Sequence, residues 1–168
     1  MHGFQLWVNL PRRDKMMAPR YQEVPAAKIP VGRSADGTAT VRVIAGESLG
    51  AHAVIATRTP ISYFDVELRP GGVLEQPLEA DHNAFAFVVS GAGVFGAERT
   101  PAKPHELVLF RNDGGVARLE ATGDSPLRAL LVAGRPLDEP VSRAGPFVMN
   151  TRAEVVQAFE DFQAGRLG

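Results

Sequence analysis

Residues 81–96 have the sequence DHNAFAFVVSGAGVFG, and this stretch decides the fold class of the chain. Large and small apolar side chains alternate with a period of two from 84 to 89, which is the pattern of a buried β-strand. The two glycines in Ser90–Gly93 tolerate positive φ, so we expect a tight turn into a second, paired strand. A strand with apolar side chains on both faces is typical of the centre of a β-sandwich or barrel.

Other segments of this kind recur along the chain at a spacing of about 8–12 residues, as expected for an all-β fold. Turn residues such as Arg69-Pro70-Gly71-Gly72 separate them. The expected strands besides the central pair are Phe4–Leu10, Val24–Ile29, Ala39–Ala45, Tyr63–Leu68, Leu107–Phe110, Gly115–Ala121 and Leu127–Ala133.

The C-terminal part of the chain follows a different pattern. Residues 134–151 are irregular and interrupted by prolines, and we expect them to lie across the surface of the barrel. Thr151 and Glu154 have the spacing of a capping box, and Gly165 suits a helix end. These signals predict one amphipathic helix over about 152–164, with its apolar side chains at Val155, Val156, Phe159 and Phe162.

The bulk composition excludes several function classes. The chain has 168 residues, a formal net charge of -1 and no cysteine. The charge gives no general attraction to nucleic acid or to a membrane surface, and the absence of cysteine excludes disulfides and thiolate chemistry. We find no signal peptide and no apolar stretch of transmembrane length, so we expect a cytoplasmic protein.

Several motifs resemble the pirin family. They are GFQLWVNLP (3–11), MMAPRYQ (16–22), VIAGE (43–47), TPI (59–61), GPFVMNT (145–151) and FQAG (162–165). The resemblance implies a bicupin, in which two double-stranded β-helix domains follow one another and the first holds Fe(II) through three histidines and a glutamate. In the family these ligands precede the QLWVNLP linker, so we expect the iron-binding half to be absent from this chain.

The resemblance therefore predicts an all-β, cupin-type double-stranded β-helix (a jelly-roll barrel) with one C-terminal α-helix. Residues 1–22 correspond to the inter-domain strand and linker, and residues 23–134 to the C-terminal cupin barrel. Residues 135–168 correspond to a segment that wraps the surface, followed by the helix. Some pirins show quercetin 2,3-dioxygenase activity, and others are described as nuclear transcription cofactors.

The remaining half does not carry the residues of a cupin metal site. Such sites resemble a pattern of His-x-His, a later glutamate and a further histidine, whose imidazoles and carboxylate converge inside the barrel. When the pattern is anchored on the glycines at 72 and 91, the four ligand positions fall at Leu78, Ala80, Ala84 and Arg118. None of these side chains is a metal ligand of that type, so we expect no cofactor in this chain.

The histidines give only weak metal candidates. Glu79 and His82 are close in sequence, and a metal bridging His82 with Glu79 or with His105 is the one arrangement to consider. Successive residues on a strand point to opposite faces, which disfavours such a site. His2 lies beside the first methionine and His52 lies in an expected loop, and a surface histidine with one hydrogen bond is the simpler interpretation of each.

Other catalytic signatures are also weak. Residues 91–96 have the pattern G-x-G-x-x-G, but no helix follows them, and Ser90 has no histidine placed to act as its base. The expected interior is apolar, which suits either a filled core or a dry pocket for a small aromatic ligand. Its expected members are Phe64, Val66, Leu74, Phe85, Phe87, Phe95, Leu109 and Leu130.

Two functions follow from these observations. The preferred one is a non-catalytic binding module, and the alternative is part of a pirin-type Fe(II)-dependent quercetin 2,3-dioxygenase whose iron-binding half is absent. Apolar side chains of Phe4, Leu6 and Val8, together with residues 135–150, would then be left exposed. We expect them to drive self-association, as a homodimer, or pairing with another protein. Direct nucleic-acid binding fits poorly, because no basic aromatic face is present.

Overall fold

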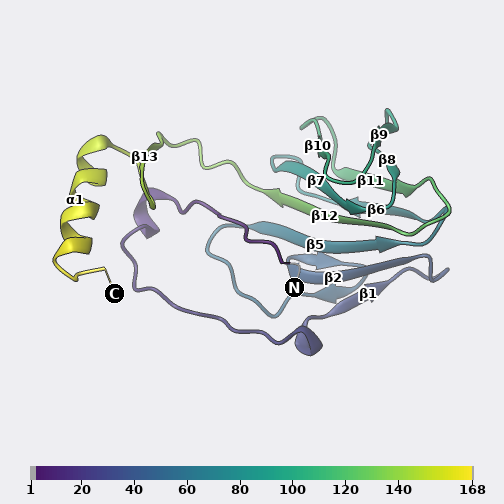
Figure 1. Ribbon diagram of the computed structural model, residues 1–168, viewed down its shortest axis with the longest axis horizontal. Helices are drawn as coiled ribbons and strands as arrows, with labels where there is room; N and C mark the ends of the chain where they lie inside the picture. Colours follow the sequence, from purple (N-terminus) through teal and green to yellow (C-terminus); the bar gives the residue numbers. More distant parts are fainter. Residues whose placement is uncertain (1–2, 168) are drawn as a thin grey trace. The chain divides into compact units, whose positions relative to one another are not determined.

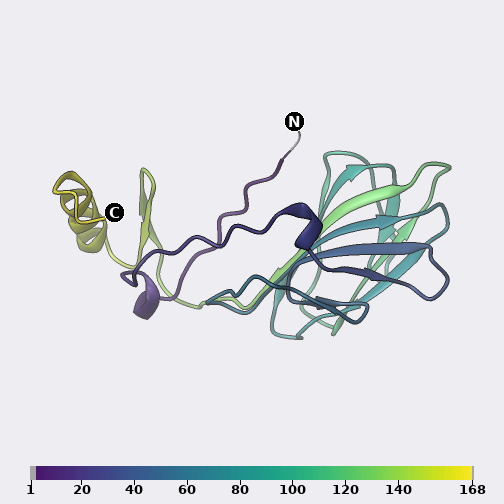
Figure 2. The same ribbon diagram turned by 90° about the horizontal axis from the view of Figure 1, so that it is seen from below.

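The computed structural model describes residues 3–167, so the prediction for His2 lies outside the described part. The chain divides into two compact units. The larger unit spans residues 22–136, and the smaller one combines the N-terminal segment up to Tyr21 with residues from Leu137 onward. Figures 1 and 2 show the strands of the larger unit and the helix of the smaller one.

The larger unit consists of two antiparallel β-sheets with a shared core. The six-stranded sheet has the order β1 (Val31–Arg33), β2 (Ala39–Ala45), β5 (Ile61–Leu68), β12 (Leu127–Gly134), β7 (Asn83–Ser90) and β10 (Leu107–Leu109). The four-stranded sheet has the order β6 (Val73–Pro77), β11 (Val116–Ala121), β8 (Gly93–Phe95) and β9 (Thr100–Ala102). A short hairpin, β3 (Glu47–Ser48) and β4 (Ala51–His52), accompanies them. The all-β prediction is confirmed, but the ladders of the described residues do not close into one continuous barrel.

The central strand β7 faces the core with its small side chains. Ala84, Ala86 and Val88 are at most 8% exposed, whereas Phe85 and Phe87 are only half-buried. The expected interior was therefore wrong for Phe85, Phe87 and Leu109, and Leu130 is buried outside the main core cluster. The alternation has two apolar faces, and a period of two alone does not say which face points inward. The core consists mainly of aliphatic side chains from both sheets: Val41, Val43, Val66, Leu68, Leu74, Leu119, Leu127 and Leu131, with Phe64 and Phe95.

The turn after β7 does not form the expected hairpin. β7 pairs with β12 and β10, while β8 pairs with β11 and β9, so residues 91 and 92 carry the chain from one sheet to the other. Gly91 has φ +74°, and a Cβ atom there would lie 2.3 Å from the backbone oxygen of Pro126. Glycine is required at this crossing because of both the positive φ and the close approach of the backbone.

Two other expected strands are absent. Residues 24–29 contain a 3-10 turn, Ala26–Lys28, and the first strand of the sheet begins only at Val31. Residues 3–10 have no regular secondary structure, so the predicted strand Phe4–Leu10 was wrong. Alternating polarity makes a strand only where the edge of another strand offers a hydrogen-bonding ladder, and the sequence does not reveal that.

The smaller unit contains a 3-10 turn (Arg12–Asp14), the hairpin β13 (Ser142–Ala144) and β14 (Phe147–Met149), and helix α1 (Arg152–Gln163). The capping box of Thr151 and Glu154 is confirmed, and Gly165 ends the helix with φ +68°. The hairpin lies within residues 134–151, which were expected to be irregular; a two-residue turn of Gly145 and Pro146 connects its strands. None of the described helices is long and apolar enough to cross a membrane.

Candidate functional site

The four positions expected for cupin metal ligands carry no suitable donors in the folded chain. Ala84 lies in the core at 8% exposure, and Leu78 and Ala80 lie in the connection between β6 and β7. The Arg118 guanidinium forms ion pairs with Glu75 (3.6 Å) and Glu120 (2.7 Å). An alkyl side chain and a paired guanidinium do not bind a cation, so these residues do not fit an iron centre.

Glu120 belongs to a structural ion-pair cluster on β11. Hydrogen bonds from Arg99 and then from Arg118 lower the pKa of Glu120 to about 2. Arg99 binds the carboxylate through two nitrogens, with Nη2 and Oε1 2.8 Å apart. Arg99 itself has φ +54° in the turn between β8 and β9. The cluster holds this turn against β11.

The weak metal candidates are not brought together. His82 is buried, and neither of its ring nitrogens has a hydrogen-bond partner. His105 is exposed, and its backbone N–H donates to Val88 O near the other end of β7. Six residues of strand separate positions 82 and 88, which corresponds to about 20 Å. Glu79 is exposed and accepts a hydrogen bond from the His82 N–H through its backbone oxygen. Within residues 3–167, no three histidine, aspartate or glutamate side chains could hold a metal ion together.

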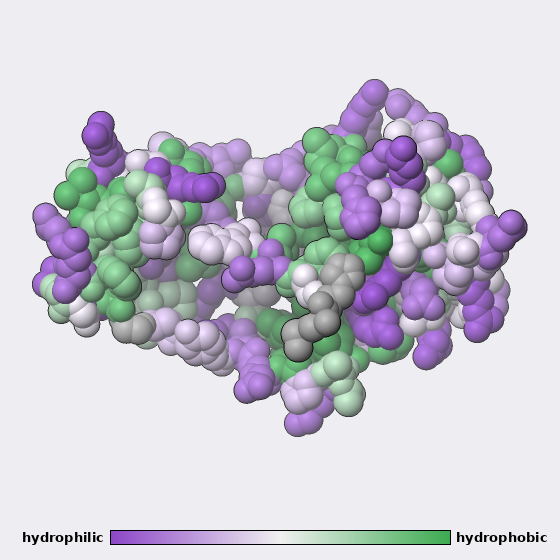
Figure 3. Space-filling model, viewed as in Figure 1, coloured by the Kyte–Doolittle hydropathy of each residue, from purple (hydrophilic) through white to green (hydrophobic). Residues whose placement is uncertain are grey.

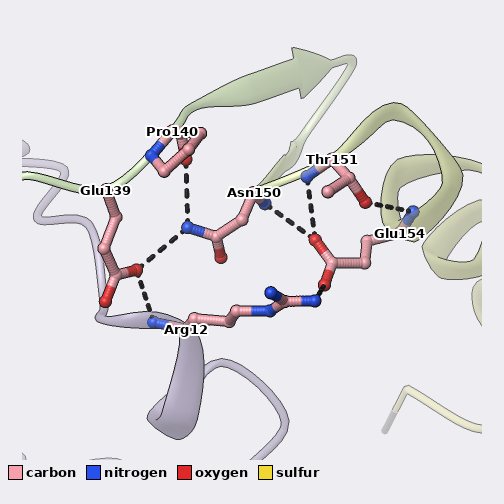
Figure 4. Close-up of polar contacts among 6 residues, drawn as sticks. All are labelled: Arg12, Glu139, Pro140, Asn150, Thr151 and Glu154. Atoms are coloured by element: carbon pink, nitrogen blue, oxygen red, sulfur yellow. Dashed lines mark hydrogen bonds and ion pairs between the residues drawn. The ribbon is translucent and has the colours of Figure 1, made fainter.

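A polar network of six residues lies in the smaller unit (Figure 4). The buried Asn150 donates from Nδ2 to Glu139 Oε2 (2.9 Å) and to Pro140 O (3.0 Å). Its backbone N–H donates to Glu154 Oε2, which also accepts the N–H of Thr151 in the capping box. The β14–α1 junction is thereby tied to the segment that precedes the hairpin.

Arg12 connects this network to the N-terminal segment. Its guanidinium lies 2.7 Å from Glu154 Oε1, and its backbone N–H donates to Glu139 Oε2 (2.8 Å). Lys15 adds a second connection, because its Nζ donates to Asn9 Oδ1 and to Val148 O of β14. Burial lowers the pKa of Lys15, although the charges of Glu139 and Glu154 oppose this effect. Two distant parts of the sequence are thus held together mainly by charge-assisted hydrogen bonds.

An apolar groove of about 570 Å³ lies beside this network in the smaller unit. Trp7, Val8 and Met16 contribute to its wall and are 67%, 45% and 62% exposed. Two cations, Lys15 and Arg143, also line it, and no acidic side chain does. Figure 3 shows apolar atoms on the surface of α1 and the neighbouring hairpin. This groove is the candidate site that the chain itself provides, and its geometry suits an apolar group with an attached negative charge.

Sequence reasoning identified part of this site. Trp7, Val8 and residues 145–149 lie in the two motifs that carried the family resemblance. The roles of Arg12, Glu139 and Asn150 were missed. Asn150 directly precedes the N-cap Thr151, and that position was the one available signal that its side chain is held by specific contacts.

Comparison with known proteins agrees with the cupin fold. The model of the pirin C-terminal cupin domain matches residues 63–168. The chain is 42% identical to a pirin-like protein of Solanum lycopersicum, covering 99% of this chain and 56% of that protein. It is 40% identical to pirin of Homo sapiens, covering 99% and 57%. The solved structure of a quercetin 2,3-dioxygenase from Acinetobacter baumannii superposes with a TM-score of 0.86 at 32% identity, covering 96% of this chain and 55% of that one.

The fold is therefore that of a cupin. The chain belongs to the pirin family. It spans about half the length of the curated relatives that it matches.

Proposed function

We propose that this chain is a non-catalytic binding module that receives a protein partner on its smaller unit. The observation that carries the proposal is the contrast between the two candidate sites. The expected ligand positions hold Ala84 and an ion-paired Arg118, whereas the groove presents exposed Trp7 and Val8. Large exposed apolar side chains around a groove are typical of interaction surfaces.

The partner of first choice is another protein chain that supplies an apolar, acidic surface. Lys15 and Arg143 line the groove, but Lys15 lies near the charges of Glu139 and Glu154, so a carboxylate on the partner would be attracted mainly by Arg143. The part of the curated relatives that this chain does not span is one such partner, and a second copy of this chain is another. We place the complex in the cytoplasm; the absence of cysteine accords with that location.

Substitutions in the groove test this surface. We expect Trp7→Asp and Val8→Asp to weaken association with an N-terminal cupin half taken from a pirin relative, or self-association of the chain. Tyr21→Asp is the matched control, because Tyr21 is fully exposed in the same unit but does not line the groove. Size-exclusion chromatography with light scattering measures both kinds of complex. Association that is equally sensitive to Tyr21→Asp, or insensitive to all three changes, would argue against the groove.

The alternative function is a part of an Fe(II)-dependent quercetin 2,3-dioxygenase. The likeness to the Acinetobacter baumannii enzyme favours it, since that protein carries this activity in its name. Under this alternative the iron is held outside the present chain, and the chain completes or stabilises the active protein.

Metal content and activity separate the two functions. The untagged chain is exposed to Fe(II) without oxygen, desalted and measured by plasma mass spectrometry, and we expect far less than one iron per chain. One iron per folded chain would overturn the proposal, and His82 would then be the first residue to substitute. Quercetin consumption that appears only when the chain is added to an isolated N-terminal cupin would establish the alternative.

A further inference from the structure

Lys15 lies in a different environment from the other two lysines of the chain. Lys28 and Lys103 are exposed. Lys15 is half-buried, and its Nζ donates to Asn9 Oδ1 (2.6 Å) and to Val148 O (2.9 Å). Both acceptors are neutral oxygens, and within residues 3–167 no carboxylate forms an ion pair with this amine. The surroundings of Lys15 therefore do less to favour its charged form than a salt bridge would.

Two neutral acceptors suit the neutral form of the amine. An –NH2 group has two N–H donors for Asn9 Oδ1 and Val148 O, and its lone pair is then left without a hydrogen bond. Burial lowers the pKa of Lys15, and this effect outweighs the opposing charges of Glu139 and Glu154. A lysine amine desolvated in an apolar site is a nucleophile that forms Schiff bases with carbonyl compounds.

The wall of the apolar groove includes Lys15 and both of its acceptors. Trp7 and Phe147 add aromatic side chains, and the volume of about 570 Å³ is in the range of small-molecule sites. Arg143 also lines the groove, is exposed and forms no ion pair within the described residues. An aromatic group suits the first pair of side chains, and a carboxylate suits the guanidinium.

We propose that this groove is a covalent binding site for aromatic aldehydes and ketones that carry a carboxylate, and that Lys15 forms an imine with them. The ammonium group first releases one proton to solvent, and the Nζ lone pair then attacks the carbonyl carbon. The carbonyl oxygen leaves as water together with the two remaining amine protons, and a C=N bond replaces the C=O bond. No oxidant or reductant is consumed, and hydrolysis reverses the step.

Reductive trapping tests the proposal in the unmodified chain. The chain is incubated in neutral buffer with 4-formylbenzoate and sodium cyanoborohydride, and peptide mass spectrometry measures the label at each lysine and, separately, at the N-terminal amine. We expect Lys15 to be labelled at least about tenfold faster than Lys28 or Lys103, because the groove holds the aldehyde beside it. The rate at Lys15 should also reach a plateau as the aldehyde concentration rises. Equal rates at the lysines, or no plateau at Lys15, would overturn the proposal.

Substitutions in the groove separate binding from simple nucleophilicity. Trp7→Ala should slow the labelling of Lys15 by about two- to tenfold and leave that of Lys103 unchanged. Tyr21→Ala is the matched control, since Tyr21 is fully exposed in the same unit and does not line the groove. Lys15→Arg should abolish the saturable labelling, because a guanidinium keeps the charge but forms no imine. Circular dichroism verifies that the variants are folded. Labelling of Lys15 that is insensitive to Trp7→Ala would contradict binding in the groove.

A pair of aldehydes tests the role of Arg143. Arg143→Ala should slow the labelling of Lys15 by 4-formylbenzoate about two- to fivefold, and should not affect labelling by benzaldehyde, which has no carboxylate. Arg152→Ala is the control, because Arg152 is exposed in the same unit but does not line the groove. An equal effect of Arg143→Ala on both aldehydes would remove the carboxylate from the proposed ligand class.

This site goes beyond the proposed function, because its ligand is a small molecule, although the two share one groove. Different measurements decide them: trapping uses the isolated chain and an aldehyde, whereas the association experiment uses a protein partner. A chain that associates through Trp7 and Val8 but shows no saturable labelling of Lys15 would overturn the carbonyl site alone. Saturable labelling in a chain that binds no protein would support the carbonyl site and leave the proposed function without support.

Discussion

The two units of the chain are stabilised by different means. In the larger unit, side chains such as Phe64, Leu68 and Leu131 are completely withdrawn from water. In the smaller unit, apolar side chains such as Trp7 and Phe162 remain more than half exposed. The residues of the smaller unit that the structure describes as buried are Pro11, Asn150, Val155 and Ala158.

The comparison distinguishes the interactions that stabilise each unit from the exposed apolar side chains to which we assign binding. In the larger unit, apolar burial at about 25 cal/mol per Å² is the main stabilising contribution. The smaller unit buries few apolar side chains, and the hydrogen bonds of Asn150, Glu154 and Arg12 hold its separate segments together.

Truncating an aromatic side chain in each unit gives the largest expected difference. Phe64→Ala should lower the free energy of unfolding by about 3–5 kcal/mol, because it opens a cavity in a fully packed core. Trp7→Ala should change it by no more than about 0.5 kcal/mol, because Trp7 is 67% exposed. Urea unfolding followed by far-UV circular dichroism measures both. A comparable loss from the two variants would show that the smaller unit has a core of its own.

Substitution of Gly91, where the chain crosses from one sheet to the other, should have the next largest effect on the free energy of unfolding. Gly91→Ala should cost about 3 kcal/mol, since the new Cβ adds left-handed strain and meets the oxygen of Pro126. Gly37→Ala is the control: Gly37 has a similar φ of +70°, but a Cβ atom added there would meet nothing within 4 Å. That variant should cost only about 1 kcal/mol. The same urea experiment applies, and equal losses would mean that strain alone accounts for the requirement at Gly91.

Local signals in the sequence predicted much of the larger unit and of helix α1. Strand β2 has the predicted limits Ala39–Ala45, and α1 begins at the residue after the predicted cap, Thr151. These features depend on residues within a few positions of one another, so a sequence displays them directly.

Features that depend on distant residues were not predictable in this way. The Arg12–Glu139 hydrogen bond joins positions 127 residues apart, and no local pattern indicates it. The inward face of β7 was assigned wrongly because size is a poor guide when both faces are apolar: Ala86 points into the core, and the larger Phe85 does not. The prediction of a hairpin after Ser90 was wrong for a similar reason. Which strand pairs with β7 depends on the packing of both sheets, not on the residues of the turn alone.

Disruption of the polar network around Asn150 should have a smaller, local effect on stability. Asn150→Ala leaves Glu139 and Pro140 without their buried donor and should destabilise the α1 region by about 1–3 kcal/mol. Hydrogen exchange read by mass spectrometry should show faster exchange in α1 peptides and unchanged exchange in β5 and β12. Gln157→Ala removes only an exposed bond to Asp161 and should have almost no effect. Unchanged exchange in α1 after Asn150→Ala would mean that apolar packing holds the smaller unit instead.

Acid should weaken the smaller unit through Glu154, and this is the smallest effect we predict. Burial alone would raise the pKa of Glu154, but hydrogen bonds from Thr151, from the Asn150 backbone and from Arg12 outweigh burial and lower it. A carboxyl whose pKa is lowered by folding stabilises the native state above its unfolded pKa of about 4.3, and that contribution is lost as the pH falls through the folded value. The fluorescence of Trp7, the only tryptophan of the chain, should report the loosening of the N-terminal segment in this range.

Glu154→Gln should remove this pH dependence, because the amide does not titrate. Asp161→Asn is the matched control, since hydrogen bonds from Arg166 and Gln157 also lower the pKa of Asp161, on the same helix. Asp161 makes its contacts within α1 and the residues that follow it, so its loss should leave the acid response of Trp7 in place. If Asp161→Asn abolishes the response and Glu154→Gln does not, the N-terminal segment is held by something other than the Arg12–Glu154 ion pair.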